Sequence, residues 1–238
     1  MRAFCYGVIL QWKLDLRNKG ILITYYLVPL IFFGFMGAIF TSINPTSKDT
    51  LVQTMIIFAI TMGAFLGTPT PLVELYSSEI KKAYKVGGIP LWVGAVNNFI
   101  SAFIHLFITS LIIYAVAPIA FDAKRPENPL LFFVSLSVFL MVSISIGTLL
   151  GLFIRSTSKL TMYSQLLFLP SLMLSGIMFP TDLLPKALAS AGYAFPATWG
   201  LKTMTSAEPD LLLFIPLIAF FIVAVIISCY KLAKIGID

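Results

Sequence analysis

Six long apolar runs without a charged residue constrain the fold of this chain more than any other sequence feature. They cover residues 21–40, 51–73, 91–116, 129–154, 160–178 and 211–230. A helix that spans a bilayer needs roughly 20 apolar residues, and each run has about that length or more. Together they occupy more than half of the 238 residues, which leaves no room for a soluble catalytic domain. We expect an all-α integral membrane protein with six transmembrane helices, built as a single domain over residues 1–238.

The composition agrees with this expectation. Hydrophobic residues make up 59% of the chain and charged residues 11%, whereas a soluble domain carries about 25% charged residues. The mean hydropathy is +0.97. So much apolar surface cannot be hidden in one water-facing core, and a soluble protein is therefore excluded.

The basic residues fall unevenly on the two sides that six crossings would create. With a cytoplasmic N-terminus, 11 of the 16 Lys and Arg lie in cytoplasmic segments: Arg2, Lys13, Arg17, Lys19, Lys81, Lys82, Lys85, Arg155, Lys159, Lys231 and Lys234. The other five lie outside: Lys48, Lys124, Arg125, Lys186 and Lys202. This positive-inside bias predicts that both termini are cytoplasmic. The net charge of +6 thus reflects topology, and nucleic acid is not an expected partner.

Residues 1–19 precede the first run and carry apolar side chains at helical spacing: Cys5, Ile9, Trp12 and Leu16. Basic residues lie elsewhere around the same helix. The pattern predicts an amphipathic helix in the membrane interface, with Trp12 at the depth of the lipid headgroups. The alternative is an N-terminal extension of the first span.

A charged island, residues 74–90, separates the second run from the third. Ser77 or Ser78 can cap a short helix there, and Gly87-Gly88 followed by Pro90 ends it. One predicted face of this helix is apolar and the other basic; the apolar face holds Leu75, Tyr76, Ile80, Ala83 and Tyr84. Pro69 and Pro71 should break or kink the second run just before it. The alternative is a solvated charged loop.

The third run carries a polar stripe, because Asn97, Ser101, His105 and Thr109 recur at steps of four. Such a stripe should face protein or a water-filled path and not lipid. His105, the single histidine, has interhelical hydrogen bonding as the alternative to a role in binding substrate.

Residues 179–204 are too apolar for a free loop and too short to span a membrane. Thr181 or Asp182 can cap a short helix through Ala191, which Gly192 ends, and Pro196 begins a second one. We expect two re-entrant helices that dip into the outer leaflet.

Chemistry that would drive transport within this chain is missing from the sequence. The apolar runs lack the acidic and basic residues that ion-coupled transporters use. The sequence contains no GxxxxGK[ST] phosphate-binding loop, no HExxH and no CxxC motif. We therefore expect no catalytic residues, no metal site and no enzyme activity, and energy that enters from another chain.

The segment LLFLPSLMLSGIMFPTDLLPKALASAGYAFPATWGLKTM resembles the signature region of type-2 ABC exporter permeases. Phe179-Pro180, Leu183-Leu184-Pro185 and Phe195-Pro196 match in order and spacing, although members often have Asn where Phe195 stands. The charged island resembles the coupling helix of that family, without its usual Arg-x-x-Gly-Thr run. The residues of the external motif are Phe179, Pro180, Pro185, Pro196 and Trp199.

The resemblance implies two ATPase subunits that hold ATP and Mg²⁺, with no cofactor in this chain. It also implies a second permease subunit, identical or related, and lipid as the remaining partner. The setting would be the cytoplasmic membrane of a prokaryote. The N-terminal helix and the charged island would dock on the ATPase, and the contact residues expected there are Glu74, Glu79, Lys81, Lys82, Tyr84 and Lys85.

The uncharged interior, rich in Met and Phe, favours export of a hydrophobic or amphipathic compound such as a drug, an antimicrobial peptide or a lipid-like molecule. The residues expected along its path are Asn98, Ser101, His105, Ser135, Thr161 and Gln165. Two alternatives stay open at this point. One is export of a lipid-linked polysaccharide or teichoic-acid precursor, and the other is a non-transporting immunity or sensor protein.

Overall fold

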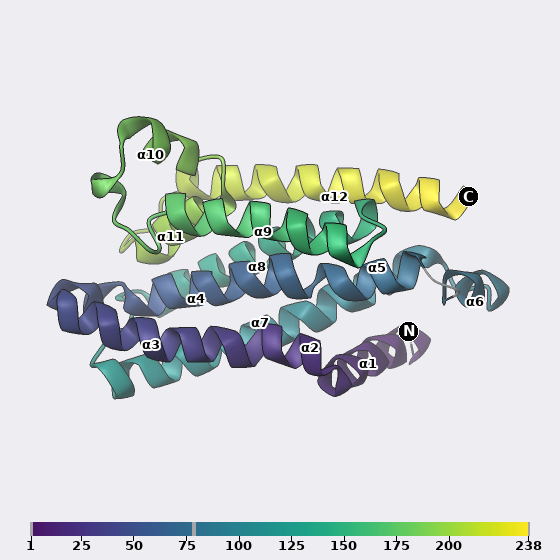
Figure 1. Ribbon diagram of the computed structural model, residues 1–238, viewed down its shortest axis with the longest axis horizontal. Coiled ribbons are helices and arrows are strands. Elements are labelled where there is room, and N and C mark those ends of the chain that lie inside the picture. Colours follow the sequence, from purple (N-terminus) through teal and green to yellow (C-terminus); the bar gives the residue numbers. More distant parts are fainter. Residues whose placement is uncertain (1, 78–79, 238) are drawn as a thin grey trace.

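Long helices lie side by side in the computed structural model, and both termini lie at the same end of the bundle (Figure 1). The structure describes residues 2–77 and 80–237, and every regular element within these ranges is helical. The elements are α1 (Arg2–Arg17), α2 (Lys19–Leu22), η1 (Ile23–Leu27), α3 (Val28–Ile43), η2 (Pro45–Asp49), α4 (Leu51–Met62), η3 (Gly63–Gly67), α5 (Pro69–Ser77), α6 (Ile80–Val86), α7 (Leu91–Phe121), α8 (Pro129–Phe153), α9 (Thr157–Leu174), η4 (Thr181–Leu183), α10 (Lys186–Gly192), α11 (Pro196–Thr205), η5 (Leu211–Leu213) and α12 (Phe214–Ile237).

Five helices of the described chain are long and apolar enough to cross a membrane: Lys19–Ile43, Leu51–Tyr76, Leu91–Phe121, Pro129–Phe153 and Leu211–Ile235. They coincide with five of the six predicted runs. The run 160–178 forms α9, which has 18 residues and ends at Leu174. Its last residues lie beyond the helix because the chain turns at Gly176, whose φ of 87° is left-handed.

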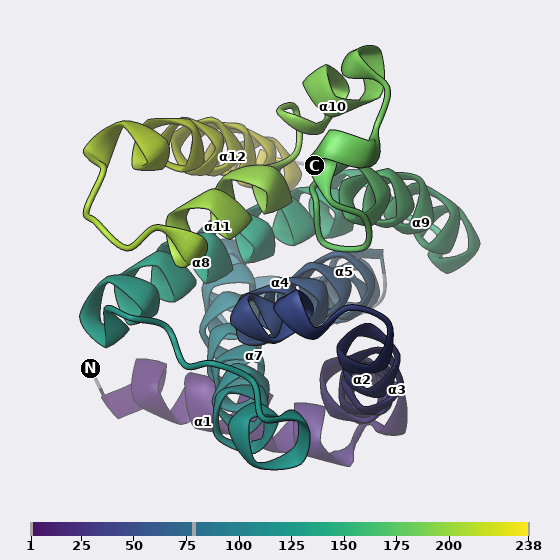
Figure 2. The same cartoon turned by 90° about the vertical axis from the view of Figure 1, so that its left-hand side faces the viewer.

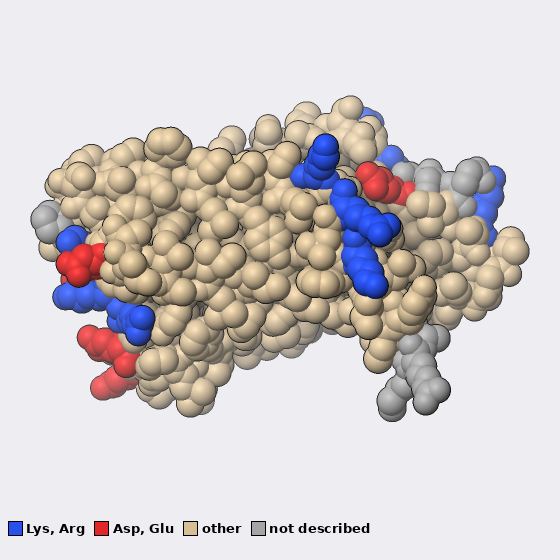
Figure 3. Space-filling model, turned by 90° about the horizontal axis from the view of Figure 1, so that it is seen from below, with Lys and Arg blue, Asp and Glu red and all other residues tan. Residues whose placement is uncertain are grey.

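The surface of the bundle is uncharged over a broad middle region (Figure 3). In this view, charged side chains lie at one end of the molecule and in a band near the other. At one end, two ion pairs join η2 to the α7–α8 loop. Lys48 lies 3.2 Å from Asp122, and Lys124 lies 2.9 Å from Asp49. An uncharged belt between charged ends is the surface that a bilayer requires.

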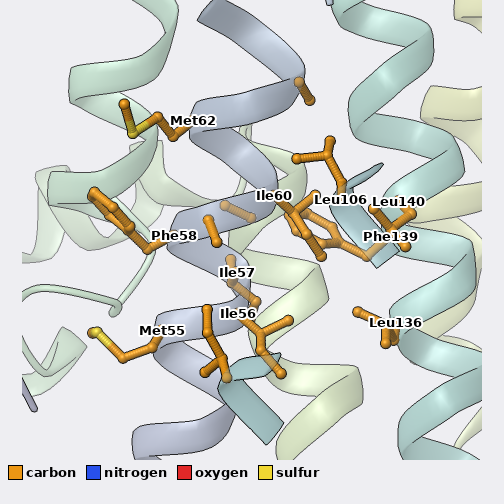
Figure 4. Close-up of a cluster of buried hydrophobic side chains, with 14 of the residues drawn as sticks. Met55, Ile56, Ile57, Phe58, Ile60, Met62, Leu106, Leu136, Phe139 and Leu140 are labelled. Atoms are coloured by element: carbon orange, nitrogen blue, oxygen red, sulfur yellow. The ribbon is translucent and has the colours of Figure 1, made fainter. Parts of the chain in front are cut away.

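The core is centred on α4, all of whose residues are buried. Ile56, Ile57 and Ile60 of α4 lie among side chains of α7 and α8, including Leu106 and Phe139 (Figure 4). A helix whose residues are all buried contacts protein on every side. The helix α4 is therefore the centre around which the other helices pack.

Glycine permits the closest helix contact in the bundle, where α8 crosses η3 and α5. A Cβ atom at Gly147 would collide with the carbonyl oxygen of Ala64, and one at Gly151 would lie 2.7 Å from Cβ of Leu72. Small residues let membrane helices approach until their backbones touch. These two positions therefore fix the distance between α8 and the second span.

Two π-helical turns, η1 and η3, meet inside the bundle. The hydroxyl oxygens of Tyr25 and Thr68 lie 3.3 Å apart, and the Thr68 amide donates to the Gly63 carbonyl at 3.0 Å. The expected break at Pro69 and Pro71 does not occur there. The irregular turn precedes the prolines, and Pro69 is the first residue of α5, a position at which no amide hydrogen is needed.

The helix α1 is separate from the first span and lies across the bundle (Figure 2). Asn18 has extended φ and ψ angles of −86° and 104°, and its side chain accepts from the amides of Gly20 and Ile21. This cap ends one helix and begins the next. The alternative of a continuous N-terminal extension is therefore wrong.

The segment after α9 holds two short helices, α10 and α11. The predicted start of the first one at Thr181 or Asp182 is wrong, because α10 begins at Lys186. Leu184 is extended before Pro185, as residues before proline usually are, so the helix starts after the proline. Gly200 of α11 packs against the ring of Phe139 in α8, which ties this segment to the core.

Candidate functional site

The charged island forms a short helix at one end of the bundle. Its helix α6 ends as predicted: Gly88 has a left-handed φ of 64°, and the amide of Ile89 donates to the Tyr84 carbonyl at 2.9 Å. Tyr84 and Tyr76 pack against a small cluster formed by Leu91 of α7 and neighbours on α8 and α12. The helix α6 is thus attached to the ends of three long helices.

The expected contact residues of this island are only partly visible. Glu74 and Lys82 are exposed, and Lys81 and Tyr84 are half-buried. Ser78 and Glu79 lie outside the described residues, as does the side chain of Lys85. Ile80 and Ala83, assigned to the apolar face, are exposed. Leu75 and the two tyrosines of that face are half-buried, and Leu75 and Tyr84 lie against α7 at Gly94.

A buried carboxylate joins α1 to α7. Asp15 is 2% exposed; its Oδ2 accepts from Ser101 Oγ at 2.6 Å and its Oδ1 from Gln11 Nε2 at 2.9 Å. Burial raises the pKa of the Asp15 carboxyl, and the two hydrogen bonds act in the opposite direction. A Cβ atom at Gly7 would lie 2.6 Å from the amide nitrogen of Asn97, so a second close contact lies two turns earlier.

His105 lies next to this carboxylate contact and is fully buried. Its Nδ1 is 2.7 Å from the hydroxyl of Tyr26, and its ring stacks between those of Trp12 and Tyr25. Thr109 donates to the Tyr25 carbonyl at 2.8 Å. The polar stripe of α7 therefore faces α1 and η1, and the prediction that it faces protein is confirmed for these residues.

Several buried polar atoms around this junction have no hydrogen-bond partner among the described residues. They are Trp12 Nε1, Asn97 Oδ1, Asn98 Oδ1 and His105 Nε2. A buried polar atom without a partner costs about 1–3 kcal/mol. The side chains of α1 and α7 thus pack closely, but some of the polar atoms buried between them have no hydrogen-bond partner among the described residues.

The residues expected along a substrate path do not converge on one cavity. Asn98 donates to the Thr68 carbonyl at 3.1 Å, and Ser101 and His105 belong to the junction just described. Ser135 of α8 donates to the Thr203 carbonyl of α11 at 3.2 Å.

The other two expected path residues lie elsewhere. Thr161 and Gln165 are exposed on α9, on a face that is otherwise apolar: Met162, Leu166, Leu169 and Met173. The expected set is thus divided between internal helix contacts and an outer face.

The external motif residues lie in two environments. Phe179, Pro180 and Pro185 are exposed in the chain that links α9 to α10. Pro196 is buried at the first turn of α11, and the indole of Trp199 donates to the Tyr193 carbonyl at 2.9 Å. No group of three or more His, Cys, Asp or Glu within the described residues is arranged to hold a metal ion.

A family comparison accounts for this architecture. A model described as ABC-2 type transporter matches residues 3–208, from α1 to the segment after α11. The chain belongs to the ABC-2 type transporter family. It is the membrane permease of such a transporter, a multi-pass membrane protein. None of the curated proteins searched matches the chain.

Sequence reasoning missed Asp15, which is the best-buried charged residue of this ABC-2 permease. The apolar spacing of Cys5, Ile9 and Leu16 predicted that their face of α1 would be the packed one. These three side chains are exposed, whereas Asp15 is buried. The sequence does contain a signal, because Gln11 and Asp15 are four residues apart and a Gln–Asp pair at this spacing hydrogen-bonds on a helix surface.

Proposed function

We propose that this ABC-2 permease exports an amphipathic compound, with energy from ATP hydrolysed by two separate ATPase subunits that bind at the end carrying α1 and α6. ATP and Mg²⁺ would be held by those subunits and not by this chain. The observation that carries the proposal is the position of α6, which projects beyond the long helices while its Tyr84, with Tyr76 of α5, packs against the cluster of Leu91, Leu152 and Ile235 (Figure 1).

In the proposed topology the chain crosses the membrane six times, with both termini in the cytoplasm. Both termini lie at one end of the bundle, which requires an even number of crossings (Figure 1). The five candidate spans alone are odd in number, and we propose α9, which contacts α4 and α8, as the sixth. The excess of basic residues at this end supports its assignment to the cytoplasm.

Motion of the ATPase would reach the membrane through two contacts. The first is α6, whose Tyr84 packs at the ends of α7, α8 and α12. The second is α1, which Asp15 and Trp12 connect to Ser101 and His105 of α7. Both contacts involve α7, so a displacement of either helix would move the same span.

The proposed path follows the exposed face of α9, opposite a second permease subunit. This face combines Met162, Leu166 and Met173 with the polar side chains of Thr161 and Gln165. Flexible Met and Leu side chains adapt to apolar cargo of different shapes, and isolated polar groups suit amphipathic cargo. Trp12, an aromatic surface on which a lipid-linked sugar could stack, is packed on His105.

Docking of the ATPase is tested by co-purification in mild detergent followed by ATP hydrolysis in proteoliposomes. Lys81→Glu with Lys82→Glu should weaken the complex about tenfold, which corresponds to about 1.4 kcal/mol. Lys186→Glu at the opposite end is the matched control and should have no effect. Equal loss in both variants, or no ATPase in the complex, would contradict the proposed docking.

The cargo class is tested by the change in ATP turnover on adding compounds. Amphipathic cations and acylated peptides should raise turnover of the intact complex, whereas soluble sugars should not. Gln165→Leu should alter the ranking of these compounds, while Lys186→Gln should preserve it. Turnover that responds to none of the amphipathic compounds would remove the support for this class.

A further inference from the structure

A shallow apolar groove of about 710 Å³ runs along the first spanning helix. Lys19 lies at one end and Ile31 at the other, with Leu22, Tyr26 and Leu30 between them. The groove follows one face of α2, η1 and the start of α3. It differs from the polar junction because its lining, apart from Lys19 and the Tyr26 hydroxyl, is apolar.

Tyr26 separates the groove from the α1–α7 junction. Its ring lines the groove, while its hydroxyl lies 2.7 Å from Nδ1 of His105. This hydrogen bond turns the polar end of the side chain toward the bundle and leaves the apolar ring toward the groove. An occupant of the groove would therefore pack against a residue that is itself tied to α7.

The length of the groove matches one leaflet of a bilayer. From Lys19 to Ile31 the helix advances 12 residues, or about 18 Å at 1.5 Å per residue. Half of a hydrocarbon core of roughly 30 Å is about 15 Å. An acyl chain that starts at the level of Lys19 would end near the middle of the membrane.

Three exposed cations lie near the Asn18 cap that joins α1 to α2: Lys13 and Arg17 in the last two turns of α1, and Lys19, which lines the end of the groove. Lys13 and Arg17 are four residues apart on one side of α1. In the part of the chain that the structure describes, none of the three forms an ion pair. The only acidic residue of α1, Asp15, is buried against α7.

We propose that the groove binds one anionic phospholipid of the leaflet on the α1 side, with its phosphate at Lys13, Arg17 and Lys19 and one acyl chain along Leu22, Tyr26 and Leu30. A neighbouring helix is a poorer occupant, because close helix packing in membranes favours Gly, Ala and Ser, and the groove lining contains none of them. A cationic end on an apolar groove fits a charged headgroup above a hydrocarbon chain.

The test measures lipids retained by the full-length permease in native mass spectrometry after incubation with equal amounts of phosphatidylglycerol and phosphatidylcholine. The unaltered protein should retain phosphatidylglycerol preferentially. Lys13→Gln, Arg17→Gln and Lys19→Gln should each lower this preference about fivefold. Free glycerol phosphate at the same concentration should not compete, because it lacks the acyl chain.

The control removes two cations from the same end of the bundle, Lys231→Gln with Lys234→Gln, and should leave the preference unchanged. Leu30→Trp fills the groove and should reduce retention of both lipids. The proposal is overturned if a variant that combines Lys13→Gln, Arg17→Gln and Lys19→Gln keeps its preference for phosphatidylglycerol. It is also overturned if the control loses this preference equally. It is also overturned if Leu30→Trp abolishes a dimer while lipid retention stays constant, since the groove would then be an interface between copies.

Discussion

The second and the last spanning helices are both long and apolar enough to cross a membrane, but one is buried inside the protein and the other is exposed. In an apolar 18-residue stretch of Leu51–Tyr76, 94% is buried inside the protein, whereas in the corresponding stretch of Leu211–Ile235 the buried share is 11%. The exposed helix is the more hydrophobic of the two. The buried helix carries Gln53, Thr61 and Thr68, and the hydroxyl of Thr61 donates to the Ile57 carbonyl at 2.7 Å.

This difference shows that hydropathy in a membrane protein measures contact with lipid and not burial. Lipid tails are as apolar as a leucine side chain, so apolar residues gain little by leaving lipid for protein. The central helix is held by close packing, glycine contacts and hydroxyls that bond to their own backbone. The last helix exposes most of its surface to lipid and packs along one side, chiefly on α8, through buried residues such as Leu217 and Ala224.

The largest effect should come from filling the closest contact of the central helix. Gly147→Leu would press a side chain against the Ala64 carbonyl and should destabilise the fold by at least about 3 kcal/mol. Gly34→Leu is the control, because no atom lies within 4 Å of a Cβ there. Thermal unfolding in detergent measures both. Similar midpoints for the two variants would contradict the central role of this contact.

The second largest effect should come from a substitution that shortens a buried side chain of α4, compared with the same substitution in α12. Ile56→Ala in α4 removes a fully buried side chain and should cost about 2 kcal/mol, because a cavity remains. Ile226→Ala in α12, where the side chain is 62% exposed, should cost less than about 0.5 kcal/mol. Chemical unfolding in the same detergent compares them, and equal losses would mean that burial does not distinguish these helices.

Between these extremes lies α1, which polar contacts attach to α7. Asp15→Ala should weaken this attachment by about 1–3 kcal/mol because Ser101 and Gln11 lose their partner. Burial raises the pKa of Asp15, so the packed state binds the proton more tightly than the free state. Packing of α1 should therefore strengthen as the pH falls through this raised pKa, and weaken as the pH rises.

Hydrogen exchange of the α1 amides at pH 5 and pH 7, corrected for intrinsic rates, measures this change. Asp15→Asn should abolish the pH dependence while keeping a hydrogen-bond acceptor for Ser101. The other titratable groups at the junction are Tyr25, Tyr26 and His105. A pH dependence that survives in Asp15→Asn belongs to one of these groups and would exclude Asp15 as its source.

The smallest effect should arise at the exposed end of α12. The Lys231 ammonium lies 4.8 Å from the centre of the Phe153 ring, a cation–π contact worth about 0.5 kcal/mol at an exposed site. Lys231→Met keeps the apolar stem and should lower the unfolding midpoint only slightly. A loss as large as that of Ile56→Ala would show that α12 is more tightly attached than its exposure indicates.

The elements that depend on local pattern were predictable from the sequence. Uncharged runs identified five spans, and Gly87-Gly88 with Pro90 located the end of α6. The polar stripe around Ser101 and His105 was expected to face protein or a water-filled path and not lipid, and these two side chains contact protein. Their place on a substrate path stays a prediction.

Features that depend on distant partners were not predictable. Asp15 and Ser101 are 86 residues apart, and no local spacing connects them. The start of α10 was misplaced because the extended backbone before Pro185 outweighed two good capping residues. The irregular turn of the second span was expected at the prolines, but it lies at Gly63–Gly67, where Tyr25 packs against both glycines.

The wide turn η3 also determines the direction in which α6 points. A π-helical turn contains one residue more than an α-helical turn, and each residue rotates a helix by about 100°. Removing one residue between Gly63 and Gly67 together with the wide turn would leave α5 and α6 facing much as they do now, whereas the same five residues in regular α-helical form would swing α5 and α6 by about 100° around the axis of α4. Tyr84 would then leave its place beside Leu91. The orientation of α6 thus depends on a wide turn that lies about four turns away along the chain.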